Sequence, residues 1–448
     1  MKKNDIVTLK IEGMSAEGSG IGKVDSMAVF VPLAAVGDEL KVKIVKVKSR
    51  YCYGIIEEII KPSANRTGCD CEVFRRCGGC VYRHISYESE CNIKFERVYN
   101  AVKRIGEQDM LPCPIISANS VNRYRNKAQY PVTDEGKAGF FATHSHRIIP
   151  CDDCRLQPEE FTKAAELIGD WIRDNGISVY NEAAHTGLIR HIYVRKAFAT
   201  GQLMVCLVIN GDYVPFKDKL IDLLVSNFGE NLKSVQLNIN TKNTNVILGD
   251  KCKLLYGEEY ITDVLCGVKI RISPLSFYQV NRDMAEKLYL KAAEYVQPKN
   301  KNILDLYCGA GTIGLSMAKA AKTVIGVEII PEAIEDAKYN AENNGIENVR
   351  FICADAKAAA EQLAREGIRP DAVIVDPPRK GCDGEVLKII AENFAPQRIV
   401  YVSCDPATLA RDIKILNGFG YSLSQYTPVD LFPRTAHVEC CVLLCRES

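Results

Sequence analysis

Apolar and polar residues alternate along the first sixty positions of the chain. The apolar runs fall at 7–11, 28–32, 42–47 and 53–55, and six glycines lie within or between them. A period of two is typical of strands with one buried face, and glycines at such short intervals favour tight turns. The pattern therefore predicts a small β-barrel of short strands over residues 1–60.

The pattern changes twice further along the chain. A helical stretch is expected around 86–105, and residues 120–270 are expected to be mixed but mostly strand, with a hairpin turn at 199–202. From about residue 300, short apolar runs alternate with amphipathic segments of helical length. The runs are Ile303–Tyr307, Thr323–Val327, Val349–Ile352, Ala372–Val375, Ile399–Val402 and Val438–Leu444.

Strands that alternate with helices in this way form βαβ units and a parallel, doubly wound sheet. We therefore predict an α/β protein in three domains: a barrel at 1–60, a mixed α+β domain at 61–270 and a Rossmann-like domain at 271–448.

Composition narrows the class of protein. The chain is 47% hydrophobic and 25% charged, with a net charge of +1, so any nucleic-acid surface must be a local patch. No apolar run is long enough to cross a membrane, and the N-terminus lacks the apolar core of a signal peptide. We expect a cytoplasmic, monomeric protein whose nineteen cysteines do not form a disulfide framework.

One strand of the predicted barrel is strongly basic. Residues 41–50 carry five basic side chains and no acidic one, and Tyr51 and Tyr53 follow. Lysines and aromatic rings together suit an RNA backbone and its bases. Lysines that protect an edge strand explain the same composition, and the two interpretations stay open on composition alone.

A glycine-rich loop follows the first strand of the predicted Rossmann-like sheet. Gly309, Gly311 and Gly314 allow a tight turn at a helix N-terminus, and Glu328 ends the next strand, where a carboxylate can hold a ribose. These features fit a dinucleotide or S-adenosylmethionine.

Three aspartates favour S-adenosylmethionine. Asp305 precedes the loop, where an acid can hold the cationic amino-acid end of the cofactor, and Asp355 follows the third strand, beside the expected position of the adenine. Asp376 opens an Asp-Pro-Pro-Arg segment that looks like the motif lining the base pocket of nucleic-acid methyltransferases. The alternative for that segment is a simple turn at the end of a strand.

Two more residues suggest covalent chemistry at the same edge. Cys404 lies between a strand and a helix N-terminus, a position that lowers a thiol pKa. Glu439 begins an otherwise apolar strand, where burial should raise its pKa toward that of a usable base. His437 is a candidate substrate contact or a structural hydrogen-bond donor.

A thiol and a base are what methylation of uracil C5 requires. C5 is too weak a nucleophile until a thiolate adds to C6, and the C5 proton must leave before the thiolate is eliminated. We therefore assign Cys404 as nucleophile and Glu439 as base, and we expect the target base to leave its stack.

These motifs resemble those of the TrmA/RumA-type RNA uracil-C5 methyltransferases over essentially the whole chain. The matching segments are Ser276–Asn281, Asp305–Gly311, Asp376–Arg379, Ser403–Asp412 and His437–Glu439. The resemblance implies that Gln279, Tyr307, Glu328 and Asp376 contact S-adenosylmethionine.

The resemblance also implies functions for the N-terminal part of the chain. Residues 1–60 resemble an OB-like TRAM domain, which favours RNA binding by the basic strand, and Tyr124–Gln129 resembles the family's RNA-facing stretch. The spacing Cys71-x5-Cys77-x2-Cys80, with Cys154 as fourth ligand, resembles the family's [4Fe-4S] motif. The spacing alone also fits a zinc site, because Cys-x2-Cys is common to both kinds of site. Cys69 and Cys151 are extra thiols close to the proposed ligands.

The expected function is methylation of a uridine in 23S rRNA. The alternative within the class is the T-loop uracil of transfer RNA, which the N-terminal barrel and the cysteine motif disfavour. A non-catalytic RNA-binding assembly factor is disfavoured by Cys404, Glu439 and the intact glycine loop. Radical chemistry is disfavoured because radical enzymes use Cys-x3-Cys-x2-Cys spacing and leave one iron open.

Overall fold

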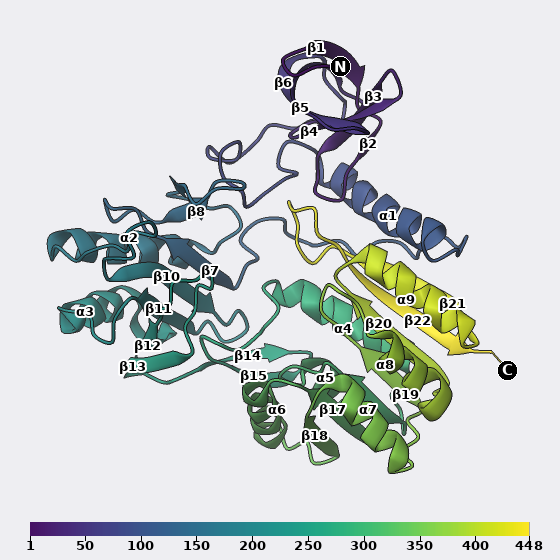
Figure 1. The fold of residues 1–448 in the computed structure, drawn as a ribbon. Coiled ribbons are helices and arrows are strands. Elements are labelled where there is room, and N and C mark those ends of the chain that lie inside the picture. The colour runs from purple at the N-terminus through teal and green to yellow at the C-terminus, as the bar shows by residue number, and fades with distance from the viewer. Residues whose placement is uncertain (448) are drawn as a thin grey trace.

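The computed structural model describes residues 1–447 and contains three larger sheets that follow one another along the chain (Figure 1). The N-terminal sheet has the strand order β1-β5-β6-β4-β3-β2. Its strands are β1 (Ile6–Lys10), β2 (Gly13–Met14), β3 (Gly20–Val24), β4 (Met27–Val31), β5 (Glu39–Val47) and β6 (Tyr51–Lys61). β1 also packs against β3, so the sheet curls around an apolar core that includes Leu9, Val29 and Val42.

The basic strand is an interior strand of this sheet. β5 pairs with β1 on one side and with β6 on the other. Its lysines therefore do not protect an edge, and the edge-strand interpretation is wrong. Tyr51, Tyr53 and Phe30 lie in mutual ring contact beside it, with centroids 5.5 to 5.8 Å apart.

The central sheet is mixed and has the order β13-β12-β11-β10-β7. Its strands are β7 (Lys127–Pro131), β10 (Ile189–Lys196), β11 (Leu203–Ile209), β12 (Leu232–Ile239) and β13 (Lys251–Gly257). A small hairpin of β8 (Gly139–Phe141) and β9 (Ile148–Pro150) lies near β7. A second hairpin, β14 (Ile261–Leu265) and β15 (Val268–Ile272), leads to the C-terminal sheet.

The central part also contains two helices, in agreement with the predicted mixed α+β domain. Helices α2 (Glu159–Asp174) and α3 (Lys217–Phe228) share one apolar core with the sheet, and a short 3₁₀ turn (Gly229–Asn231) follows α3. Strand still exceeds helix between residues 120 and 270, in agreement with the mixed, mostly stranded segment that the pattern predicts. The predicted hairpin turn at 199–202 does join β10 to β11.

The C-terminal sheet is a Rossmann-like sheet of order β18-β17-β16-β19-β20-β22-β21. Six of the seven strands run in one direction, whereas β22 is antiparallel to both of its neighbours. The strands are β16 (Asn302–Leu306), β17 (Thr323–Glu328), β18 (Val349–Cys353), β19 (Ala372–Val375), β20 (Arg398–Ser403), β21 (Tyr421–Val429) and β22 (Glu439–Arg446). The predicted α/β fold is confirmed.

Helices cover both faces of this sheet (Figure 1). One face carries α4 (Arg282–Val296), α5 (Thr312–Ala318) and α6 (Pro331–Asn343). The other face carries α7 (Ala356–Arg365), α8 (Gly384–Lys388), a π-helical turn (Ile389–Phe394) and α9 (Pro406–Gly418). Helix α1 (Tyr87–Arg104) comes early in the chain, yet it packs against α9 and β21.

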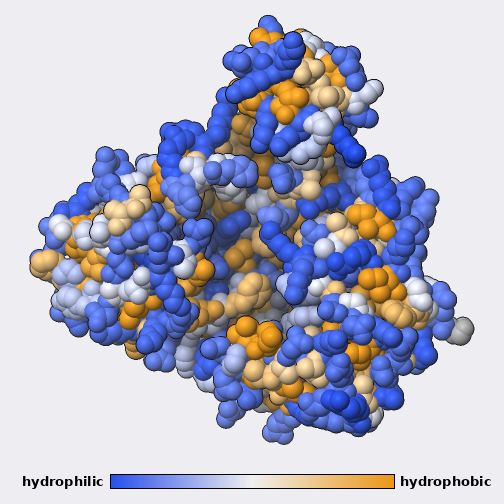
Figure 2. All heavy atoms as spheres, in the orientation of Figure 1, coloured by the Kyte–Doolittle hydropathy of each residue, from blue (hydrophilic) through white to orange (hydrophobic). Residues whose placement is uncertain are grey.

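The three sheets surround a hollow on the face shown in Figure 2. Helix α1 and the segments next to it join the N-terminal sheet to the C-terminal sheet. Among the described residues, no helix is both long and apolar enough to cross a membrane. The predicted boundaries near residues 60 and 270 stay predictions.

Candidate active site

Cys404 and Glu439 lie next to each other at the carboxyl edge of the C-terminal sheet. Strands β20 and β22 pair through Ser403 and Cys440. Cys404 directly follows β20 and Glu439 is the first residue of β22, so each lies one residue beyond that pair. Asp376 directly follows β19, the other neighbour of β20. Residues far apart in sequence therefore meet where open α/β sheets bind their ligands.

Burial is the largest influence on the pKa values of Cys404, Glu439 and Asp376. Glu439 is only 4% exposed, and burial, followed by the nearby Asp376 charge, raises its pKa to about 8. Burial also raises the pKa of Asp376 to about 7. Arg379 opposes these effects at Glu439 because its positive charge favours the ionised carboxylate.

The thiol of Cys404 has a raised pKa, which corrects the expectation from its position before a helix. Burial, then Glu439 and then Asp376 raise the pKa to about 11, and Arg379 partly offsets them. The first amides of α9 do not compensate, because the Asp405 carboxylate already accepts hydrogen bonds from Ala407 N and Thr408 N at 2.9 and 3.0 Å. Arg379 is thus the cation that favours both ionised groups, a role that its place in the Asp-Pro-Pro-Arg segment did not reveal.

This arrangement predicts the pH dependence of Cys404 alkylation. A raised pKa keeps the thiol protonated, so its labelling by iodoacetamide should rise about 100-fold from pH 7 to pH 9 without levelling off. Cys252 is an internal control, because a hydrogen bond with the Cys206 thiol lowers its pKa to about 7 and its labelling should level off near pH 8. Arg379→Met should slow Cys404 labelling at every pH in this range. Quantification of each peptide by mass spectrometry measures the rates, and a plateau for Cys404 below pH 9 would contradict the assignment.

The glycine loop and Asp305 form a cradle after β16. Gly309 and Gly311 have φ of +54° and +77°, values that glycine adopts without strain. Asp305 Oδ2 accepts a hydrogen bond from Gly314 N at 2.9 Å, whereas Oδ1 is buried without a hydrogen-bond partner among the described residues. Burial raises the pKa of Asp305 to about 7. A buried, unpaired carboxylate oxygen fits the cationic ammonium group of an amino-acid ligand.

The other predicted cofactor residues make different contacts. Glu328 at the end of β17 accepts a hydrogen bond from Gly309 N at 3.1 Å, and Tyr307 precedes the glycines with φ of +66°. The carbonyl of Gln279 accepts a hydrogen bond from Asn126 at 2.8 Å, which joins it to the Tyr124–Gln129 stretch. Asp355 caps α7 through Lys357 N and Ala358 N, so one of its oxygens has a structural role.

Five cysteines line one small cavity of about 70 Å³ in the connecting region between the N-terminal and central sheets. They are Cys71, Cys77, Cys80, Cys154 and the extra thiol Cys151. Within residues 1–447, no group of three or more His, Cys, Asp or Glu side chains is arranged so that it could hold a metal ion. The structure therefore brings the four predicted ligands to one cavity without showing the cluster itself.

Two arginines also line this cavity. Arg83 is 4% exposed and binds Asp70 at 2.8 Å, and Arg125 lies beside it. Arg83 Nη2 and Arg125 Nε are buried, and neither has a hydrogen-bond partner in the part of the chain that is described. Unpaired cationic donors facing thiols fit an anionic, thiolate-bound cofactor.

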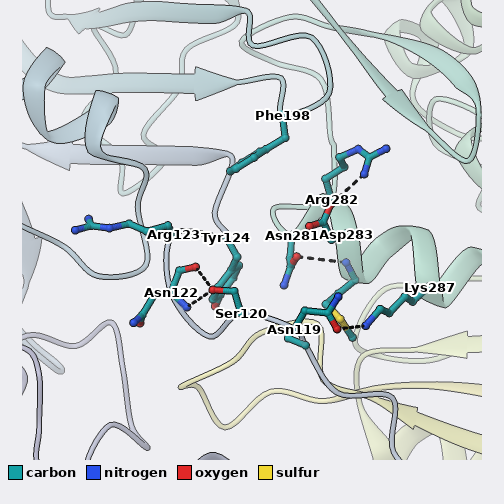
Figure 3. A pocket seen from close by; sticks show the side chains of 12 residues that line it. Asn119, Ser120, Asn122, Arg123, Tyr124, Phe198, Asn281, Arg282, Asp283 and Lys287 are labelled. Atoms are coloured by element: carbon teal, nitrogen blue, oxygen red, sulfur yellow. Dashed lines mark hydrogen bonds and ion pairs between the residues drawn. The ribbon is translucent and has the colours of Figure 1, made fainter.

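A larger cavity of about 270 Å³ lies between the central sheet and α4 (Figure 3). Its cations already have partners: Lys287 binds Asn119 at 3.1 Å, Arg123 binds Asp153 at 2.6 Å and Arg282 binds Glu286 at 3.0 Å. Neither Cys404 nor Glu439 lines this cavity. His437, the remaining candidate, lies edge-on to Phe432, with ring centroids 6.1 Å apart.

The strand order, the glycine loop after β16 and the acids along the carboxyl edge define a Rossmann-like methyltransferase. The family model described as tRNA (Uracil-5-)-methyltransferase matches residues 94–447, and the TRAM domain model matches residues 2–56. The chain therefore belongs to the tRNA (uracil-5-)-methyltransferase family. It is an S-adenosylmethionine-dependent RNA (uracil-5-)-methyltransferase.

Individual relatives agree with this assignment over the whole chain. An uncharacterized RNA methyltransferase of Halalkalibacterium halodurans is 44% identical, covering 99% of this chain and 98% of the relative. One from Clostridium acetobutylicum is also 44% identical, covering 100% of this chain and 98% of the relative. The solved structure of Pyrococcus abyssi tRNA (uracil-54, C5)-methyltransferase in complex with S-adenosyl-L-homocysteine is 26% identical, with a TM-score of 0.80 and coverage of 98% and 99%.

Proposed function

We propose that this enzyme methylates C5 of a uridine in 23S rRNA, in the cytoplasm, through a covalent adduct between Cys404 and C6 of the base. The observation that carries the chemistry is the position of Cys404 beside the buried Glu439 at the ends of β20 and β22. A nucleophile and a base at adjoining strand ends can act on neighbouring atoms of one ring.

The reaction proceeds in successive steps. The Cys404 thiolate adds to C6, and the electron pair of the C5–C6 double bond moves toward O4 to give an enolate. S-adenosylmethionine would supply the methyl group that C5 attacks, and S-adenosyl-L-homocysteine would leave. Glu439 then takes the C5 proton, the C5–C6 double bond re-forms, and the Cys404 thiolate leaves C6. Arg379 favours the ionised forms of both groups.

We propose that the cofactor occupies the cradle after β16. Asp305 would hold its ammonium group through the unpaired Oδ1, and Glu328 would hold its ribose. Gly309 and Gly311 allow close approach of the backbone, and Tyr307, Gln279, Asp355 and Asp376 would complete the site. The unpaired Oδ1 of Asp305 is the observation that best supports this placement.

We also propose that Cys71, Cys77, Cys80 and Cys154 bind a [4Fe-4S] cluster, with Arg83 and Arg125 offsetting its negative charge. The cluster would hold the segment 71–80 against the loop around Cys154. No step of methyl transfer is assigned to it. Cys151 lines the same cavity, whereas Cys69 is exposed and does not.

Iron content tests the proposed ligands. Protein purified without oxygen should be brown and contain about four irons and four sulfides per chain. Cys77→Ser should lose most of the iron, whereas Cys69→Ser, a matched change at an exposed thiol, should keep it. Elemental analysis and visible absorbance measure both. Zinc in place of iron, or equal losses in the two variants, would refute the assignment.

Transfer RNA is the second candidate substrate. The Pyrococcus abyssi tRNA (uracil-54, C5)-methyltransferase aligns with 98% of this chain, so the presence of an N-terminal sheet does not by itself decide between the RNAs. The basic strand β5 and the adjoining Phe30, Tyr51 and Tyr53 rings support an RNA surface. The choice of 23S rRNA rests on the resemblance of the barrel and the cysteine motif to ribosomal-RNA enzymes.

A labelling assay separates the two substrates. Purified enzyme and tritiated cofactor are mixed with unmodified 23S rRNA or with unmodified bulk tRNA, and 5-methyluridine is measured by mass spectrometry. We expect labelling of 23S rRNA at a defined uridine. Labelling of tRNA alone would make tRNA the substrate, and no 5-methyluridine in either RNA would favour a non-catalytic role.

A further inference from the structure

The loop that precedes Glu439 is held by residues from distant parts of the chain. Residues 430–438, which we call the base loop, join β21 to β22. Asp430 and Glu90 are fully buried and both bind the Lys94 ammonium group, at 2.6 and 2.7 Å. This network fixes the start of the base loop against helix α1.

Arg434 makes most of the contacts at the centre of the base loop. Its amide donates to Glu90 Oε1 at 2.6 Å, and its carbonyl accepts from Val81 N and Tyr82 N at 2.8 and 3.2 Å. Its guanidinium donates to Ile85 O at 3.0 Å. Val81 and Tyr82 directly follow Cys80, so one residue joins the cysteine segment, α1 and the base loop.

The backbone of Arg434 is strained. Its φ is +70°, a left-handed value that a long side chain adopts at a cost. Such a conformation persists only when surrounding contacts determine it. At Arg434 these contacts are made by its backbone amide, its backbone carbonyl and its guanidinium group.

The rest of the base loop is fixed in the same way. Pro433 O accepts from the Tyr124 hydroxyl at 2.9 Å, which comes from the predicted RNA-facing stretch. Ala436 O accepts from Arg97 Nη1 at 2.8 Å, and the same nitrogen donates to Ala16 O of the N-terminal sheet region at 3.1 Å. Elements from all three parts of the molecule therefore meet a few residues before Glu439.

We propose that Arg434 is a positioning residue for Glu439, and that it links the placement of this base to the segment after Cys80. The proposal rests on the proposed function, because it concerns the step that Glu439 performs. Cys404 directly follows β20 and lies outside the base loop. Loss of Arg434 contacts should therefore slow proton removal and leave thiolate addition and methyl transfer nearly intact.

Arg434→Gly is the direct test, because glycine adopts the positive φ without strain while the guanidinium contacts are lost. With RNA and tritiated cofactor, we expect methyl transfer to the RNA within twofold of the wild-type rate. Release of methylated RNA should slow at least tenfold, so a labelled RNA–protein adduct accumulates on a denaturing gel. Arg434→Lys should restore part of the release rate, because an ammonium group can still donate to Ile85 O and Glu90.

Two comparison variants separate the possible outcomes. Arg369→Gly, a change at an exposed arginine after α7, should behave as wild type. If Arg434→Gly slows every step equally, with no rise in adduct, Arg434 is merely structural and the proposal is wrong. If Glu439→Gln accumulates no adduct, the proposed chemistry itself fails and this proposal falls with it.

Discussion

Cys404→Ala should abolish formation of 5-methyluridine and of any covalent RNA–protein adduct. Without the thiolate, C5 of the uracil is too weak a nucleophile to take the methyl group, so the rate should fall by about 10⁴-fold or more. Incubation with RNA and tritiated cofactor, followed by a denaturing gel and nucleoside analysis, measures both products. Cofactor binding should persist, because the cradle after β16 does not include Cys404.

The comparison variant is Cys252→Ala, which removes an exposed thiol of the central sheet. It should keep wild-type activity and show that loss of one cysteine among nineteen does not disturb the protein. Full activity in Cys404→Ala would overturn the covalent mechanism. An adduct that persisted in Cys404→Ala would assign the nucleophile to another residue.

Much of the C-terminal sheet can be predicted from the local sequence. The apolar run at 372–375 coincides with β19, and the run at 303–307 is offset by one residue from β16. Short apolar strands followed by amphipathic helices leave few arrangements open, because parallel strands need crossover helices. The end of each strand could therefore be placed at one edge, which located Asp376 and Cys404.

Other elements carry a weaker local signal. Strand β21 (Tyr421–Val429) begins with an alternation of apolar and polar residues that breaks at Gln425, where its register is irregular. Helix α2 does carry helical spacing, with Phe161, Ile168 and Trp171 buried against the central sheet. The sequence of residues 159–174 therefore favours a helix within a mostly stranded segment.

The electrostatics of the site could not be predicted from local sequence. The position of Cys404 before α9 suggested a lowered pKa, yet Asp405 occupies the helix amides and two carboxylates from other strands lie nearby. Glu439 comes 35 positions later in the chain, and Asp376 comes 28 positions earlier. Only the pairing of β20 with β19 and β22 brings these charges together.

Glu439→Gln should separate methyl transfer from product release. Glutamine is nearly the same size but cannot accept the C5 proton, so elimination of Cys404 should slow by roughly 10² to 10⁴-fold, the usual contribution of a general base. The methyl group should still transfer, because that step precedes the loss of the proton. A labelled RNA–protein adduct should therefore accumulate in amounts close to one per enzyme.

The pH dependence provides an independent check of the same residue. Because burial raises the pKa of Glu439 to about 8, the carboxylate form of the free enzyme increases as the pH rises through that value and is lost as the pH falls below it. Adduct release by the wild-type enzyme should accordingly quicken from pH 7 to pH 9. The slow release in Glu439→Gln should not follow this rise, because the glutamine does not titrate. Rapid release in this variant would assign proton removal to another group, and the adjacent Asp376, whose pKa burial raises to about 7, would be the next to test.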